Sequence, residues 1–201
     1  MYIKIGSLAV YVSFSFAAFL ALAANMSGGK NLLLSLLFSF LHEAVHLIFL
    51  YFSGIKKAEI KLFPAGIKIC CEGLGLLSYR KTVLAALSAP VFNIISGAVF
   101  LCLYNFSENR IFLICCTVNL ILGLINLLPL SFLDGGRVLE AVLSSKFPEE
   151  KVRLVMRTCG IWSLAFLFTA VFIGFVMGKA QVFLLFFCVY CLMGTITAKS
   201  K

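Results

Sequence analysis

His42, Glu43 and His46 form an HExxH pattern inside a run of apolar residues, and these are the only two histidines in the chain. Residues four apart on a helix lie on one face about one turn apart, so both imidazoles can bind one metal ion. Two histidine nitrogens are half of a tetrahedral zinc site. Glu43 lies beside them, where its carboxylate can act as general base on a water held by the zinc. The pattern therefore predicts a hydrolytic zinc centre.

The alternative is a pair of buried histidines satisfied by Glu43 or by backbone groups. Ionisable side chains at membrane depth are costly, and they mark functional sites by default. Packing alone would not compensate for three of them together, so the catalytic interpretation is favoured.

A catalytic zinc takes a third protein ligand and keeps one position open for water. Asp134 is the only aspartate in the chain, and it follows a proline in a segment where a helix should break. Glu72 is the other candidate, 26 residues after His46, in a loop bounded by Gly66 and Gly73. The residues alone leave both open.

The elements that must position these groups are membrane helices. Hydrophobic residues make up 62% of the 201 residues and charged residues 12%, against about 45–50% and about 25% in soluble domains. We expect an all-α polytopic membrane protein, a single domain over residues 1–201 with a catalytic core at about 31–145. Six apolar runs approach the roughly 20 residues that cross a bilayer: Ile5–Asn25, Leu32–Ser53, Thr82–Tyr104, Ile111–Leu130, Gly160–Met177 and Gln181–Thr197.

The net charge of +9 does not indicate nucleic-acid binding. With six spans and the N-terminus inside, 14 of the 17 basic residues fall on inner segments, which is a strong positive-inside bias. The basic charge therefore predicts orientation and contact with anionic lipid. Lys4 and the stretch Ala21–Ala24 loosely resemble a signal peptide, but the run is long, so a retained anchor is favoured.

The eight cysteines do not predict a disulfide framework, because most lie in or at the ends of the spans, where cysteine behaves as a small apolar residue. Cys188 and Cys191 form a lone CxxC in an apolar run, which is a weak signal for a metal or redox site.

Two inner segments should carry irregular structure. Alternating residues around Glu59–Leu62 and Ile67–Ile69, with Pro64 and Gly66 between them, predict a short membrane-associated β-hairpin. Such a hairpin is either a surface cap or an edge strand that pairs with an extended substrate. In the second segment, Pro129 and the Gly135-Gly136 pair predict a break in the fourth span, with Asp134 in it and a short helix over Arg137–Phe147 after it.

Three motifs together resemble the site-2 protease family of intramembrane zinc metalloproteases. These are His42-Glu43-Ala44-Val45-His46, the stretch from Asn126 to Gly136 that matches an N-x-x-P…L-D-G signature, and Ser88–Asn93, which is similar to a G-P-x-x-N stretch with Ala89 in place of glycine. They occur in the family's order over about half the chain. The resemblance implies three core helices, a zinc ion and Asp134 as its third ligand.

The layout is most similar to the stage IV sporulation branch, whose members release a sigma factor from a membrane-tethered pro-form. There is no room for a PDZ domain between the motifs, and no CBS domain follows the sixth span. Val45 and Phe132 also depart from the family's usual residues, without touching a ligand. The resemblance implies hydrolysis in or near the transmembrane segment of a membrane-tethered protein, with Asn93 and Asn126 as candidate oxyanion donors.

The expected setting is a bacterial cell membrane, with the site opening to the cytoplasm and a membrane protein that inhibits or activates the enzyme. Helix-to-helix hydrogen bonding is the other interpretation of the two asparagines. A zinc-binding membrane protein without hydrolysis, such as a transporter or sensor, is the alternative function. The single HExxH, with no second copy, disfavours transport.

Overall fold

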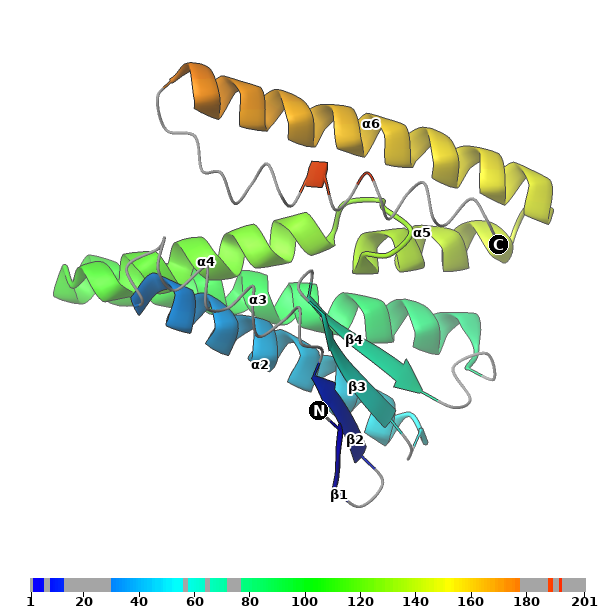
Figure 1. Cartoon of the computed structure of the whole chain (residues 1–201), viewed down its shortest axis with the longest axis horizontal. Helices are drawn as coiled ribbons and strands as arrows, with labels where there is room; N and C mark the ends of the chain where they lie inside the picture. Colours follow the sequence, from blue (N-terminus) through cyan, green and yellow to red (C-terminus); the bar gives the residue numbers. More distant parts are fainter. Residues whose placement is uncertain are drawn as a thin grey trace. The chain divides into compact units, whose positions relative to one another are not determined.

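In the computed structural model the chain forms two compact units, residues 1–125 and 126–201; Figure 1 shows the elements of both. The residues that the structure describes are 2–5, 8–12, 30–55, 58–63, 66–71, 77–177, 188, 189 and 192.

The described part of the first unit contains three helices: α2 (Lys30–Phe52), α3 (Tyr79–Ser107) and α4 (Arg110–Asn126). At 1.5 Å per residue, α2 is about 34 Å long and α3 about 44 Å, enough to cross a hydrocarbon core of about 30 Å. The turn between α3 and α4 is tight. Glu108 adopts a left-handed conformation (φ 53°), and its N–H donates to the carbonyl of Tyr104 at 2.7 Å. This ends α3 with a left-handed cap and returns the chain along α4.

A four-stranded sheet completes this unit, in the order β1 (Tyr2–Ile5), β2 (Leu8–Val12), β3 (Ala58–Phe63) and β4 (Gly66–Cys71). β3 and β4 pair antiparallel where the sequence predicts a hairpin, with Ala58 opposite Cys71 and Phe63 opposite Gly66. The sheet is larger than that hairpin, because β2 pairs parallel with β3 and antiparallel with β1. The fold is therefore mainly helical with a small sheet, and β1 and β4 are its edges.

The predicted first span, Ile5–Asn25, is wrong at its start. Leu8–Val12 is a strand that runs beside β3, in register from Leu8 opposite Ala58 to Val12 opposite Leu62. A short apolar run fits a buried strand as well as a helix, and Val10, Tyr11 and Val12 favour a strand. The rest of that run, including the proposed signal-peptide site, lies outside the described residues.

The second unit contains α5 (Asp134–Ser144) and α6 (Glu149–Val176). Pro148 precedes α6, a position where its fixed φ angle fits a helix start. The core of this unit is centred on Leu130, which is fully buried against Leu164 and Leu167 of α6.

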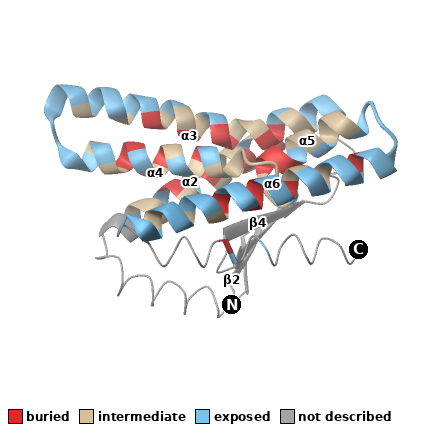
Figure 2. Ribbon diagram, turned by 90° about the horizontal axis from the view of Figure 1, so that it is seen from above, coloured by how far each residue is buried: buried red, intermediate tan, exposed pale blue. Residues whose placement is uncertain are grey.

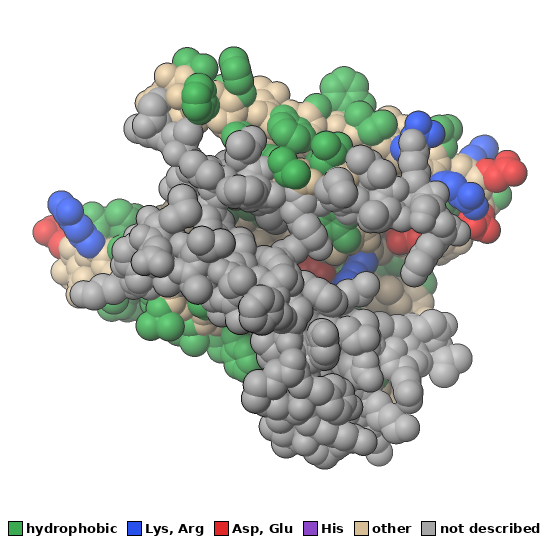
Figure 3. All heavy atoms as spheres, in the orientation of Figure 1, with side chains coloured by type: hydrophobic (Ala, Val, Ile, Leu, Met, Phe, Trp, Pro, Cys, Tyr) green, Lys and Arg blue, Asp and Glu red, His purple; other side chains and the backbone are tan. Residues whose placement is uncertain are grey.

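Figure 3 shows apolar side chains along the helices and charged ones gathered near helix ends, as expected for helices in a membrane.

Three described helices are long and apolar enough to cross a membrane, at Leu33–Phe52, Tyr79–Ser107 and Glu149–Val176, and α4 is a shorter apolar helix. They correspond to the predicted second, third, fifth and fourth spans. The predicted sixth span, Gln181–Thr197, lies almost wholly outside the described residues. Large apolar side chains such as Phe40, Ile95 and Trp162 are exposed along these helices, and Figure 2 shows long exposed stretches on them. These faces are suited to lipid.

Candidate metal centre

Helix α2 carries His42 and His46 on one buried face. Only 3% of His42 and 6% of His46 is exposed. Their rings meet edge to face, with centroids 4.9 Å apart and an interplanar angle of 88°. The one-turn spacing predicted from the sequence therefore brings both imidazoles into direct contact.

Helix α3 orients each imidazole through its Nδ1 atom. Nδ1 of His42 lies 3.1 Å from the side-chain oxygen of Asn93, and Nδ1 of His46 lies 2.8 Å from the carbonyl oxygen of Ala85. Both partners are acceptors, so each Nδ1 must carry the proton and donate it. A neutral imidazole protonated at Nδ1 presents its lone pair at Nε2, which is the state in which a histidine binds a metal.

Pro90 interrupts helix α3 close to the Ala85 carbonyl that accepts from His46, although Ala85 itself does not lose a donor. Proline has no N–H, so Pro90 cannot donate to the carbonyl of Ala86, and the hydrogen-bond ladder of α3 is interrupted in the turn that contains Ala85. The Ser88 hydroxyl also donates to the Ala85 carbonyl, at 2.8 Å, and lies 3.5 Å from Nδ1 of His46. Small side chains at Ala85, Ala86 and Ala89, all buried, leave room for α2 to approach.

Asp134 is the first residue of α5, where the partial positive charge of a helix N-terminus favours a carboxylate. The predicted break is displaced: it covers 127–133, while Asp134 and the two glycines already belong to the helix. A Cβ on Gly135 would overlap the carbonyl of Leu127, and one on Gly136 would overlap that of Leu130. The two glycines therefore allow the first turn of α5 to pack directly against the preceding loop. This close packing fixes the position of Asp134 at the start of the helix.

The carboxylate of Asp134 is 7% exposed and has a cationic neighbour one turn further along α5. Nη1 of Arg137 lies 3.6 Å from Oδ1 of Asp134, with the Arg137 side chain 47% exposed. This ion pair is long and half-solvated, so its contribution to stability is small.

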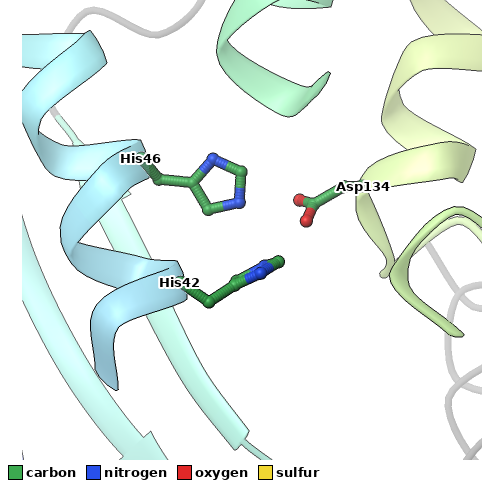
Figure 4. Close-up of side chains that lie close together, drawn as sticks. All are labelled: His42, His46 and Asp134. Atoms are coloured by element: carbon green, nitrogen blue, oxygen red, sulfur yellow. The ribbon is translucent and has the colours of Figure 1, made fainter. Parts of the chain in front are cut away.

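His42, His46 and Asp134 each offer one ligand atom, and these atoms lie within 4.8 Å of one another (Figure 4). All three residues are buried. Two imidazole nitrogens and one carboxylate oxygen are a donor set that catalytic zinc takes, with a fourth position left for water. The residues therefore fit a zinc ion, and they form a possible metal-binding group.

The remaining predicted residues are placed as follows. Glu43 is half-buried on α2 beside His42, and Asn126 is half-buried at the end of α4. Asn93 is fully buried, and its oxygen is already used by His42. Glu72 and Cys191 lie outside the described residues, while Cys188 is a buried free thiol in the apolar core around Leu130.

The sequence interpretation missed two contributors: the Ala85 carbonyl and Arg137. Arg137 could have been found as a cation three residues after Asp134. Nothing in the sequence pattern indicates a backbone carbonyl as the partner of His46.

Comparison with known proteins shows the family of this chain. The family model described as peptidase family M50 matches residues 65–167, about half of the chain. The chain belongs to peptidase family M50. The matched segment includes Asn93 and Asp134, and the HExxH pattern precedes it. Membership makes this chain a metalloprotease by family, and the M50 proteases depend on zinc.

A solved structure agrees with the fold of this M50 protein. The site-2 protease from Methanocaldococcus jannaschii is similar over 98% of this chain and 94% of its own, with a TM-score of 0.70 and 21% sequence identity. No curated protein matches the sequence. The apolar helices and the family together support a membrane protein.

Proposed function

We propose that this M50 protein is an intramembrane zinc metalloprotease in which His42, His46 and Asp134 hold the metal ion. The observation that carries the proposal is the use of both Nδ1 atoms by α3, which leaves both Nε2 atoms as the metal-binding nitrogens. The buried carboxylate of Asp134 supplies the third donor.

When bound, the zinc ion lowers the pKa of its water ligand and polarises the scissile carbonyl. Glu43 is the general base: its carboxylate takes a proton from the attacking water and delivers it to the leaving amine. Asn93 and Ala85 accept from the Nδ1 atoms of His42 and His46, so the Nε2 atoms are the ones that would face the metal. Side-chain amides donate to developing oxyanions, so Asn126, and Asn93 through its Nδ2 atom, are the candidate donors.

The substrate class we propose is a membrane-tethered protein cleaved in or near its transmembrane segment. A helical segment must become extended before its peptide bond can be attacked. β4 is an edge of the described sheet, and an edge strand can pair with an extended peptide through main-chain hydrogen bonds. Resemblance to the stage IV sporulation branch makes a pro-sigma factor the first substrate to test.

The proposed setting is a bacterial cell membrane with the N-terminus and the site towards the cytoplasm. The support is that 11 of the 17 basic residues lie in two segments, 54–81 and 137–157, which a chain that crosses the membrane at α2, α3, α4 and α6 leaves on one side. His42 and His46 lie about 10–16 Å from the end of their span, by 1.5 Å per residue. A membrane protein that inhibits or activates the enzyme is a further expected partner.

The test is cleavage of a tagged, membrane-tethered pro-sigma factor in cells that express either the wild type or Glu43→Gln. We expect cleavage by the wild type and none by the variant, with equal zinc content in the two purified proteins, since Glu43 is not a ligand. Glu150→Gln is a matched control, because Glu150 is an exposed acid at the start of α6.

Equal cleavage by wild type and Glu43→Gln would assign the activity to a host protease. Zinc bound without any cleavage, over a panel of tethered substrates, would favour a zinc transporter or sensor instead. A wild type that purifies without zinc would refute the proposed centre.

A further inference from the structure

Two asparagines of the first unit are fully buried, and each has one side-chain atom with no hydrogen-bond partner among the described residues. These atoms are Nδ2 of Asn93 on α3 and Oδ1 of Asn119 on α4. An unsatisfied buried polar atom destabilises the folded protein. Such groups in native proteins are almost always paired with protein or with ordered water.

In each asparagine, the hydrogen bond made by one atom of the side-chain amide shows whether the other atom is the nitrogen or the oxygen. With a metal on Nε2, His42 carries its proton at Nδ1, so the Asn93 oxygen accepts there and the Nδ2 donors of Asn93 point elsewhere. Asn119 bonds the carbonyl oxygen of Cys115 at 2.8 Å, and only its Nδ2 can donate there. One side chain therefore lacks an acceptor and the other lacks a donor.

Close contacts between α3 and α4 place the two asparagines on the faces where these helices pack together. A Cβ on Gly123 would lie 3.3 Å from the Cβ of Asn93, and a Cβ on Gly97 would lie 2.8 Å from Leu120. Asn119 is one turn before Gly123 and next to Leu120, so it lies on the face of α4 that packs against Asn93 and Gly97. Glycines at both contacts let the helix backbones approach closely.

We infer that Asn119 is a positioning residue for His42, linked to it through one buried water and Asn93. The water accepts from Nδ2 of Asn93 and donates to Oδ1 of Asn119, which satisfies both atoms. The chain of hydrogen bonds then runs from the Cys115 carbonyl to the imidazole of His42. Both ends of the Asn93 amide are used in holding His42, which leaves the oxyanion role to Asn126.

The inference rests on the proposed zinc site, and its consequence is a change in metal affinity. Partners of metal-binding histidines typically change affinity by 10–100-fold when they are removed. Asn119 acts one step further out, so we expect roughly three- to tenfold for the loss of its acceptor.

The test compares Asn119→Thr with Asn119→Val in the full-length protein in detergent. The two side chains have nearly the same shape, and only threonine keeps a hydroxyl. Thr117 and Thr169 already donate to the carbonyl four residues earlier, at 2.8 Å each, and such a hydroxyl still accepts a hydrogen bond. We expect the threonine variant to bind zinc three- to tenfold more tightly than the valine variant, measured by competition with a chromophoric chelator.

The same pair is then made in an Asn93→Ala background, where the link to His42 is cut. There the difference between threonine and valine should fall below about twofold, because coupled residues lose their effect when the partner is absent. Thermal unfolding of each variant is measured in parallel. A purely structural role would change the melting temperature by the same amount in both backgrounds and leave zinc affinity unaffected.

Equal zinc affinity of the two Asn119 variants, or a difference that persists in Asn93→Ala, would overturn the inference. A wild type that binds no zinc would overturn the proposed function, and the inference with it. If the valine variants do not fold, Asn119→Ser is compared with Asn119→Ala instead, and the same criteria apply.

Discussion

Substituting Gly135 by alanine should inactivate this metalloprotease even though alanine is the better helix former. Gly135 lies in the first turn of α5, next to Asp134. In an unconstrained helix the change would stabilise the protein by up to about 1 kcal/mol. Here the new Cβ would overlap the carbonyl group of Leu127, which is backbone and cannot rotate away. The start of α5 must therefore shift.

The magnitude follows from the size of that shift. A Cβ on Gly135 would lie 2.1 Å from the Leu127 oxygen, and real Cβ contacts are essentially never shorter than 3.0 Å, so the helix start must move by about 1 Å, and Asp134 moves with it. A 1 Å displacement in a catalytic site costs roughly 100-fold in rate, or about 2.7 kcal/mol. Overpacking should lower the free energy of unfolding by about 1–3 kcal/mol as well.

The assay measures initial cleavage rates, zinc content and thermal unfolding for Gly135→Ala beside Gly174→Ala. Gly174 is a matched control, because it is helical and a Cβ there would meet nothing within 4 Å. We expect the control to keep its rate and to melt at the same or a slightly higher temperature. Wild-type cleavage by Gly135→Ala would refute the steric argument.

Three further substitutions test individual contacts. Ser88→Ala should change zinc affinity less than about twofold, because the Ala85 carbonyl accepts from His46 at 2.8 Å while the hydroxyl lies at 3.5 Å; a loss above fivefold by chelator competition would contradict this. Arg137→Met should weaken zinc binding by no more than a few-fold, since its ion pair is long and half-exposed; complete loss would show a larger role. Leu130→Ala should lower the free energy of unfolding by about 2–5 kcal/mol through a cavity in the core of the second unit, and an unchanged melting temperature would show that the loop is not anchored there.

The helical part of the fold could be predicted from the sequence because length and hydropathy are read directly. The runs beginning at Leu32, Thr82 and Gly160 became α2, α3 and part of α6. The strand at Leu8–Val12 could not be recognised, because its partner β3 is about 50 residues away and pairs in parallel across the whole of α2. Local periodicity contains no information about such a pairing.

The candidate site was predictable as a set of residue types and much less so as a geometry. Spacing alone placed His42 and His46 on one face, and the structure agrees. The partners of their Nδ1 atoms lie about 40–50 residues away on α3, so they depend on how two helices pack. Asp134 was named from its place in a predicted helix break and from resemblance to a motif, and Asn126 from the resemblance alone; their roles stay predictions.

The structure also gives a physical reason for the Ser88–Asn93 stretch, which has no metal ligand of its own. Ala85 accepts from His46 and Asn93 accepts from His42, eight residues or about 12 Å apart along α3. The histidines are only four residues, about 6 Å, apart on α2. α3 can serve both only if it crosses α2 closely, which the small buried residues permit. Pro90 lacks an N–H, so it removes the helical donor of the Ala86 carbonyl and not that of Ala85, whose carbonyl can accept from His46 with its second lone pair. The Ser88–Asn93 stretch thus supplies the partner of His42 through Asn93, and its Ser88 hydroxyl donates to the Ala85 carbonyl that His46 uses.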